Sequence, residues 1–393
     1  MAKRVALTGN EAVALAMKQI NPDVVAAYPI TPQTDIVQYF SSFVADGQVT
    51  TEFVRVESEH SAMSAVIGSS AAGARSITAT SSQGLALMHE MLHIASSYRL
   101  PIVMPVVNRA LSGPINIHCD HSDSMNARDT GWIQLYCEDT QEAYDNMFIA
   151  LKIAEDPRVL TPVMVCFDGF IISHALENLV VEDEDVIKKY VGQFEPDRYL
   201  LDVDNPHTIG PLALYDYYFE VKRQQAEVMF HAMDAVSEAS AEYGKVTGRN
   251  YDLFETYKLD DADVGIIVIG STAGTARGAV DKLREQGVKA GLIKLRVFRP
   301  APREEIVAAI RHLKALAVMD RADSYAGFGG PLFGEVRSWL YGTGASLPVV
   351  NFVYGLGGRD VVVNDVASVY EYLDKLVRNQ APLQLVQYLG VRE

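Results

Sequence analysis

Apolar residues recur in short blocks through the first part of the chain, and turn residues separate these blocks from longer stretches with helical spacing. Such blocks are typical of strands that are buried on both faces of a parallel sheet. We predict strands at 24–28, 53–56, 76–80, 101–107, 132–136 and 162–167. Helices are predicted between them, at 11–20, 35–44, 61–72, 85–97 and 140–154. This alternation predicts a doubly wound, mostly parallel α/β sheet.

Polar residues mark where the first two helices are expected to begin. Asn10 is the expected N-cap of the first helix, and Thr34 or Asp35 that of the second. A side-chain oxygen at such a position can accept a hydrogen bond from a free backbone N–H of the first turn.

The pattern changes between Glu177 and about Asp261. An acidic run at 182–185 and an irregular stretch precede a helix, from about 212 to 243, in which charged and apolar residues are interleaved. We expect this segment to be a connector wrapped on the first domain. The α/β rhythm then resumes, with strands at 264–269, 290–296 and 315–319, helices at 275–286 and 303–314, and a break at 298–302.

Length and composition set the limits of this picture. The chain has 393 residues, enough for two domains, which we predict at 1–258, including the connector from about 177, and at 259–393. Its formal net charge of −16 argues against nucleic acid or an anionic membrane as a partner. No apolar run reaches the roughly 18–20 residues of a membrane span, and no secretory signal is expected.

The three cysteines, Cys119, Cys137 and Cys166, lie far apart and form no Cys-x-x-Cys pair. They cannot build a self-contained iron–sulfur or structural zinc site, so any such centre must belong to another chain. Free cysteines without a secretory signal predict a reducing, cytoplasmic setting.

The turn after the first predicted strand, Tyr28-Pro29-Ile30-Thr31-Pro32, presents the small hydroxyl of Thr31. Its two prolines cannot donate to a sheet, so the strand must stop there. Open α/β sheets bind ligands at the carboxyl ends of their strands, which is where this turn lies. From these residues alone, an ordinary strand-to-helix turn is the simpler interpretation.

Glu59 lies at the handover from a strand to a helix, and Arg109 follows another strand. Glu59 either stabilises the helix N-terminus, by about 0.3–1 kcal/mol, or acts as a buried acid that hydrogen-bonds a ring nitrogen. Glu57, two residues earlier, is expected to face solvent. Arg109 either forms a surface ion pair or binds a substrate carboxylate. Because Thr31 and Arg109 both follow strands, we expect them to converge on one crevice.

Three other polar stretches give weaker signals. The run 118–123 contains metal-ligand types, but no distant residue completes a set, so we predict a polar loop and no metal site. The run 78–84 offers hydroxyl and amide donors at a helix N-terminus. Gly270–Gly274 is not a full dinucleotide-binding motif.

Four motifs occur together and in order. They are Tyr28-Pro29-Ile30-Thr31-Pro32, Glu57-Ser58-Glu59-His60-Ser61-Ala62, Thr80-Ser81-Ser82-Gln83-Gly84-Leu85, and Asn108-Arg109-Ala110-Leu111-Ser112 continuing to Asp120-His121-Ser122-Asp123. With these motifs the chain resembles the alpha subunits of the pyruvate:ferredoxin oxidoreductase family, which are thiamine diphosphate-dependent 2-oxoacid:acceptor oxidoreductases. The second domain, with 270–272 and 295–300, resembles the transketolase C-terminal domain of that family.

The resemblance implies roles for particular residues. Glu59 would hydrogen-bond the aminopyrimidine N1′ of thiamine diphosphate and promote the imino tautomer that removes the thiazolium C2 proton. Pro29, Ile30, Ser82 and Gln83 would contact the cofactor. Thr31 and Arg109 would bind the substrate carboxylate and keto oxygen. The diphosphate-binding Gly-Asp-Gly…Asn motif is missing at Asp168-Gly169, which implies that a separate beta subunit holds the diphosphate and Mg²⁺.

The resemblance also implies a reaction and partners. A 2-oxoacid would lose CO₂, its acyl group would pass to coenzyme A, and electrons would pass singly to [4Fe-4S] clusters on gamma and delta subunits and on to ferredoxin, in anaerobic metabolism. A single cation at Arg109 beside the neutral Thr31 suits a small 2-oxoacid with one carboxylate, and we expect pyruvate. Branched-chain 2-oxoacids and 2-oxoglutarate stay open as alternatives.

Two alternatives stay open. A transketolase or 2-oxoacid dehydrogenase component would share the thiamine chemistry without using ferredoxin. A non-catalytic scaffold subunit would keep the fold but is expected to have lost Thr31, Glu59 or Arg109, and all three are present.

Overall fold

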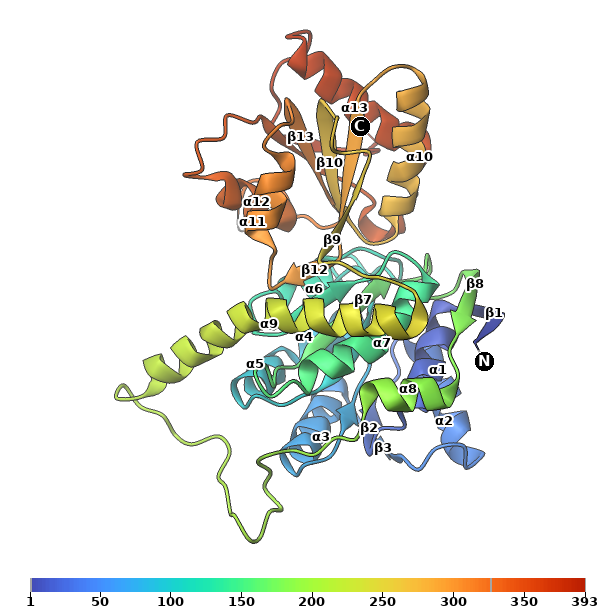
Figure 1. Ribbon diagram of the computed structural model, residues 1–393, viewed down its shortest axis with the longest axis vertical. Coiled ribbons are helices and arrows are strands. Elements are labelled where there is room, and N and C mark those ends of the chain that lie inside the picture. Colours follow the sequence, from blue (N-terminus) through green and yellow to red (C-terminus); the bar gives the residue numbers. More distant parts are fainter. Residues whose placement is uncertain (1, 326, 393) are drawn as a thin grey trace.

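The computed structural model describes residues 2–325 and 327–392. Two large β-sheets, each covered by helices, lie one above the other (Figure 1). The lower, seven-stranded sheet has the order β12-β6-β7-β5-β4-β2-β3. Its strands are β2 (Val24–Ala27), β3 (Glu52–Arg55), β4 (Ser76–Ile77), β5 (Val103–Asn108), β6 (Ile133–Tyr136), β7 (Val163–Asp168) and β12 (Val297–Arg299). All neighbours are parallel except β12, which is antiparallel to β6. The predicted doubly wound, mostly parallel sheet is confirmed.

The strand order reverses direction between β2 and β4. From β2 the chain moves outward to β3, returns to β4 on the other side of β2, and continues to β5. Such a reversal leaves a crevice outside the carboxyl ends of the strands, where open α/β sheets bind ligands.

Helices cover both faces of this sheet. They are α1 (Gly9–Ile20), α2 (Thr34–Ala45), α3 (Glu59–Ala71), α4 (Ser82–Leu87), α5 (His89–Ser97), α6 (Ser122–Asn126), α7 (Thr140–Ala154) and α8 (Glu184–Val191). The helix predicted at 85–97 is two helices that meet at Met88. The strand predicted at 76–80 is only two residues long, and Thr80 adds an isolated bridge to Val106.

Both predicted N-caps were wrong. Thr8 caps α1, since its hydroxyl accepts from Glu11 N while the Glu11 carboxylate accepts from Thr8 N. Asn10 instead donates to the carbonyl of Pro32, 2.7 Å away. Gln33 occupies the N-cap position of α2 and makes no side-chain capping bond there. The helix α1 is thus capped locally, two residues before the predicted position, and Asn10 makes a tertiary contact with the Pro32 turn instead.

Two antiparallel strands at the edge of the first domain were not predicted. They are β1 (Lys3–Thr8) and β8 (Leu176–Val181). Both are largely exposed or half-buried, so neither shows the continuous apolar run of a central strand.

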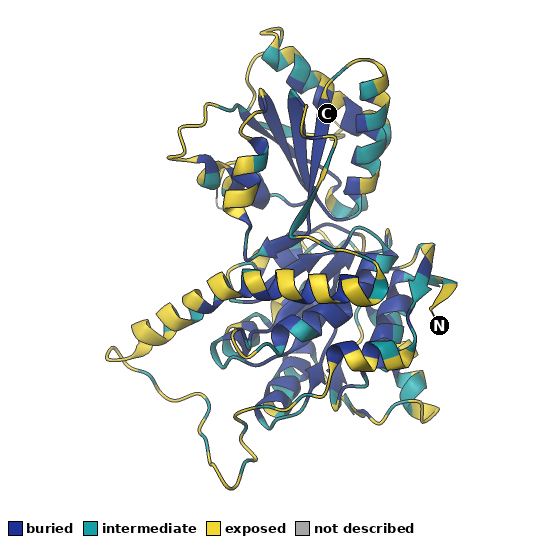
Figure 2. Cartoon of the chain, viewed as in Figure 1, coloured by how far each residue is buried: buried dark blue, intermediate teal, exposed yellow. Residues whose placement is uncertain are grey.

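The connector ends in a long helix, α9 (Tyr218–Thr247), which crosses the first domain (Figure 1). The sequence placed its start about six residues too early, near 212. Its buried face includes Val228, Ala232, Val236 and Tyr243, which join the core of the first domain, whereas its first turns are exposed (Figure 2). The alternation of charged and apolar residues thus reflects a helix that packs one face against the first domain.

The second domain contains a six-stranded sheet with the order β15-β14-β13-β10-β11-β9. Its strands are β9 (Phe254–Tyr257), β10 (Val264–Ile269), β11 (Ala290–Leu295), β13 (Ala315–Asp320), β14 (Val349–Val353) and β15 (Val386–Tyr388). Its helices are α10 (Thr272–Glu285), α11 (Arg303–Ile310), α12 (Pro331–Leu340) and α13 (Val363–Val377), with a 3-10 turn, η1 (Leu356–Gly358). Only β9 is antiparallel to its neighbour.

The predicted break at 298–302 was wrong at its start, because β12 adds to the sheet of the first domain beside β6. Lys294, only 2% exposed, reinforces this junction through Glu138 and Glu142 of the first domain. Within residues 2–325 and 327–392, no helix combines the length and the apolar character that crossing a membrane requires.

Candidate active site

Four strands of the first sheet deliver the predicted site residues to one crevice. Thr31 follows β2, Glu59 follows β3, Ser82 and Gln83 follow β4, and Arg109 follows β5. These strands flank the reversal of strand order, so their carboxyl ends converge on the crevice described above.

Glu59 is buried in the first turn of α3, with 7% of its surface exposed. Its neighbour across the crevice is Gly84 of α4, where an added Cβ would lie 2.7 Å from Glu59 Oε1 and 2.5 Å from Thr80 Oγ1. Among the described residues, no side chain or backbone group pairs with the Glu59 carboxylate. Glu57 is exposed, as predicted, and accepts a hydrogen bond from Ser61. A buried acid without a partner is costly, and it is ready to bind a ligand.

Other polar atoms beside Glu59 are buried and also lack partners among the described residues. They are Thr80 Oγ1, Ser81 Oγ and Gln83 Nε2. Buried polar groups are normally hydrogen-bonded, so three in neighbouring positions indicate that a polar ligand belongs here. Gly84 leaves the space open, because any side chain there would meet Glu59.

Ser82 makes hydrogen bonds within the protein. Its backbone has φ +47°, its N–H donates to Asp123 Oδ2 at 2.9 Å, and its hydroxyl lies 2.6 Å from the carbonyl of Ala110. Its side chain therefore links α4 to the loop after β5. The turn after β2 is more open, since Pro29 and Thr31 are exposed and Ile30 is half-buried.

Arg109 is buried, with 6% exposed, and is held by carbonyl oxygens. Its Nη1 donates to the carbonyl of Thr31 and its Nε to that of Asn116, both at 2.8 Å. The predicted convergence of Thr31 and Arg109 is thus observed. No carboxylate in the described part of the chain lies within 4 Å of the guanidinium. Burial lowers the pKa of Arg109, although the charge of Asp123 opposes this shift. An uncompensated buried cation of this kind is an anion-binding group.

Asp123 connects the two sides of the crevice, a role that the sequence did not predict although Asp123 lies in the polar run 118–123. Its carboxylate accepts from the backbone N–H of Ser82 and of Arg109 and from the side chain of Asn108. Burial nevertheless raises the pKa of Asp123 to about 6. The run 118–123, which includes Asp123, predicted a polar loop, but nothing local indicated a partner 41 residues away.

A second buried cluster joins the two domains. Asp168 Oδ1 lies 2.7 Å from His121 Nε2, and Asp168 Oδ2 accepts from Arg321 Nη1 at 2.8 Å. With Cys119, His121 and Asp168 place potential metal ligands within 4.8 Å of one another. The Arg321 guanidinium already supplies the positive charge that Asp168 requires, so the cluster works as a domain junction.

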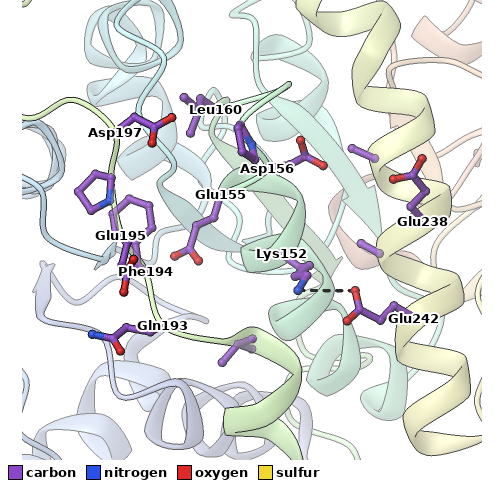
Figure 3. A pocket seen from close by; sticks show the side chains of 15 residues that line it. Lys152, Glu155, Asp156, Leu160, Gln193, Phe194, Glu195, Asp197, Glu238 and Glu242 are labelled. Carbon is purple, nitrogen blue, oxygen red and sulfur yellow. Dashed lines mark ion pairs between the residues drawn. The ribbon is translucent and has the colours of Figure 1, made fainter.

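A separate cavity of about 350 Å³ lies between α7, α9 and the segment 191–197 (Figure 3). It is lined by acidic residues, and Lys152 pairs with Glu242 at its edge. None of the predicted site residues lines it.

Comparison with known proteins assigns the chain to a family. Residues 15–243 match the family described as pyruvate flavodoxin/ferredoxin oxidoreductase, thiamine diphosphate-binding, and residues 262–366 match pyruvate:ferredoxin oxidoreductase core domain II. The chain belongs to the pyruvate:ferredoxin oxidoreductase family. The crevice beside Glu59 therefore lies in a thiamine diphosphate-binding domain.

Relatives in this family are similar over the whole chain. Pyruvate synthase subunit PorA of Thermotoga maritima is 52% identical over 391 residues, covering 100% of this chain and 99% of the relative. Pyruvate synthase subunit PorA of Pyrococcus furiosus is 44% identical, covering 99% and 98%. Ketoisovalerate oxidoreductase subunit VorA of Pyrococcus abyssi is 43% identical, covering 95% and 94%. The predicted family and the predicted 2-oxoacid oxidoreductase function are confirmed.

Two solved structures share the fold of this chain. The 2-oxoglutarate:ferredoxin oxidoreductase of Magnetococcus marinus has a TM-score of 0.73 at 22% identity, covering 94% of this chain and 65% of that one. This chain thus spans about two thirds of that protein. A split-gene transketolase has a TM-score of 0.55 at 15% identity, covering 93% and 98%. The predicted pair of thiamine-binding and transketolase-like folds is confirmed.

Proposed function

We propose that this chain is the alpha subunit of a pyruvate synthase, in which pyruvate and coenzyme A yield acetyl-coenzyme A and CO₂, and ferredoxin accepts two electrons one at a time. The observation that carries the proposal is Arg109, a buried guanidinium without a carboxylate partner among the described residues, held against the Thr31 turn at the same end of the sheet as Glu59. The identity of 52% to a pyruvate synthase subunit over the whole chain supports the same activity.

The residues of the crevice fit the aminopyrimidine end of thiamine diphosphate. Glu59 is the buried acid for a ring nitrogen, and Gln83 offers an unpartnered Nε2 beside it. Pro29 and Ile30, on the turn after β2, are the apolar contacts we expect for the ring. When bound, thiamine diphosphate supplies the nucleophilic carbon that adds to the keto group of a 2-oxoacid and stabilises the charge left by departing CO₂. Glu59 keeps a proton at the ring nitrogen and thereby sets the tautomer.

Arg109 and Thr31 are the substrate-binding residues of the proposal. Arg109 is fixed through Nη1 and Nε, which leaves Nη2 free of protein partners among the described residues. Free guanidinium N–H groups bind carboxylates strongly. The Thr31 hydroxyl lies on the exposed turn that receives Arg109, close enough in the fold to contact a keto oxygen.

A branched-chain 2-oxoacid is the second candidate substrate. The ketoisovalerate relative is 43% identical to this chain, nearly the value of the Pyrococcus furiosus pyruvate synthase subunit at 44%. Both acids carry one carboxylate, which suits the single cation Arg109. A dicarboxylate such as 2-oxoglutarate is expected to require a second cation.

Partner subunits complete the reaction in this proposal. A beta subunit holds the diphosphate and Mg²⁺, while gamma and delta subunits carry [4Fe-4S] clusters and deliver electrons to ferredoxin. The cysteines of this chain support cluster binding elsewhere, because Cys119, Cys137 and Cys166 are buried, separate thiols. Such thiols suit the reducing, cytoplasmic setting expected from the sequence.

Anaerobic purification of the tagged chain with its partners tests the proposal. The complex is assayed for coenzyme A-dependent reduction of a viologen dye with pyruvate, 2-oxoisovalerate and 2-oxoglutarate. We expect pyruvate to have the highest kcat/KM. Preference for a larger acid would overturn the substrate, activity without coenzyme A would favour a dehydrogenase component, and an intact but inactive iron–sulfur complex would favour the scaffold interpretation.

A further inference from the structure

The position of Arg109 depends on a loop that has little packing of its own. Arg109 Nε donates to the carbonyl of Asn116 at 2.8 Å. The residues on either side of Asn116 are exposed, Ile115 by 79% and Ile117 by 42%. Exposed apolar residues bury little surface, so this loop needs another element to keep the Asn116 carbonyl in place.

That element is the turn η1 (Leu356–Gly358) of the second domain. Asn116 Nδ2 donates to the carbonyl of Gly357 at 3.0 Å. Gly357 N donates to Asp120 at 3.2 Å, and Gly358 N donates to the carbonyl of Cys119 at 2.6 Å. The turn therefore holds the loop at both ends of the segment 116–120, across a separation of more than 200 residues in sequence.

Two glycines allow this close approach. Gly357 and Gly358 have φ values of +60° and +79°, which residues other than glycine rarely adopt. A Cβ on Gly357 would collide with Asn116 Nδ2, and a Cβ on Gly358 would collide with His118 Cβ. Any larger residue at either position must push the loop away from the turn.

The junction between the domains has its main supports elsewhere. They are the β12–β6 pairing, the Asp168–Arg321 pair and the ion pairs of Lys294. The contact between Asn116 and Gly357 is thus one of several that join the domains. What sets this contact apart is its position, because it fixes the residue whose carbonyl, that of Asn116, accepts a hydrogen bond from Arg109 Nε.

We propose that Asn116 is a positioning residue through which the η1 turn of the second domain aligns Arg109 for the substrate carboxylate. The role of Arg109 in this inference rests on the proposed function. The second domain, which contributes none of the predicted site residues, thereby takes part in substrate affinity.

The inference is tested in the purified complex with Asn116→Ala and Gly357→Ala. We expect each substitution to raise the KM for the 2-oxoacid about three- to tenfold, the effect of one hydrogen bond, with kcat and the KM for coenzyme A changed less than about twofold. Because both act on the same contact, the double variant is expected to match the larger single effect. Additive effects, or an unchanged KM in either single variant, would overturn the inference.

Arg277→Gln is the matched control. Arg277 also pairs across the domains, with Glu138. It makes no hydrogen bond or ion pair with Arg109, Asn116 or Gly357, which are all described residues. We expect it to leave the KM for the 2-oxoacid unchanged, and an equal rise in KM would show that any loosening of the junction has the same effect.

Hydrogen exchange of the amides at 110–119 gives a readout that needs no turnover. We expect faster exchange in Asn116→Ala and Gly357→Ala but not in Arg277→Gln. If the unmodified complex turns over no 2-oxoacid, the proposed function has failed. Unchanged exchange in the two variants would then overturn the positioning role by itself.

Discussion

Arg109 and Arg321 are both buried arginines at strand ends, yet their surroundings differ. Arg109 is 6% exposed and Arg321 is 4% exposed. The guanidinium of Arg321 donates to the carboxylate of Asp168 at 2.8 Å, whereas the guanidinium of Arg109 donates only to carbonyl oxygens and has no carboxylate partner in the described part of the chain. Burial lowers the pKa of both, but the neighbouring Cys119 and Asp168 raise that of Arg321 well above its usual value, whereas the pKa of Arg109 stays lowered.

The difference separates a structural charge from a functional one. A buried ion pair is complete within the protein, and removing one partner leaves an uncompensated charge. Arg109 has no such partner, so its charge is left for a ligand. The acids follow the same division, because Asp168 is paired with Arg321 and His121 while Glu59 has no partner among the described residues.

The largest effect on catalysis is expected from Glu59→Ala. The proposed proton position at the cofactor ring is lost, so kcat should fall by about 10²–10⁴-fold. The complex should assemble and unfold at the same temperature, since Glu59 holds no other residue in place. The matched control is Glu57→Ala, on the exposed side of the same segment. Full turnover in Glu59→Ala would remove this residue from the chemistry.

Asp168→Ala should show the opposite signature, with its main effect on stability. Arg321 would be left buried without its carboxylate, so the free energy of unfolding should fall by about 3–5 kcal/mol. Thermal unfolding of the complex, followed by calorimetry, measures the change. A variant that is inactive but fully stable would place Asp168 with the functional residues and break the comparison.

Arg109→Ala should reduce kcat/KM for the 2-oxoacid by about 2–5 kcal/mol in transition-state free energy. Most of the loss is expected in KM, because the carboxylate has its full charge in the bound substrate and loses that charge as CO₂ departs. Arg109→Lys keeps the charge but not the bidentate geometry, so it should recover only part of the loss. The free energy of unfolding should fall less than in Asp168→Ala, because only hydrogen bonds to carbonyl oxygens are lost and no buried charge loses its partner. An unchanged KM would place Arg109 outside the site.

The smallest effect is a pH dependence at Asp123. Burial raises its pKa from 3.8 to about 6, so the folded state favours the neutral carboxyl. This contribution to stability is present below about pH 4 and is lost as the pH rises through 6, by up to about 3 kcal/mol.

Thermal unfolding of the complex and of Asp123→Asn between pH 4.5 and 7.5 measures this dependence. We expect the stability advantage of the unmodified protein to be largest at the acidic end. Asp168→Asn should lack this trend, because the pKa of Asp168 is lowered and its stabilisation persists above pH 4. A stability advantage that grows towards neutral pH would mean that the pKa of Asp123 is lowered, not raised, in the folded protein.

The sequence by itself determined the central strands and several helices. The apolar runs at 163–168 and 264–269 and the helix at 140–154 were predicted within a residue of their observed limits. These elements are buried, so their local pattern reports directly on their environment. The edge strands β1 and β8 and the added strand β12 were missed, because their formation depends on a partner distant in sequence. The Thr8 cap was missed although its signal is local, a capping box with Glu11 three residues later.

For the site, the sequence and its family resemblance indicated Thr31, Glu59 and Arg109, since each lies within four residues of the end of a strand. Only the tertiary structure decided what holds them. Arg109 meets Thr31 across 78 residues, Asp123 reaches Ser82 across 41, and Gly357 meets Asn116 across 241. Local spacing predicts where a strand ends, whereas the partner of a buried charge is chosen by the folding of the whole chain around it.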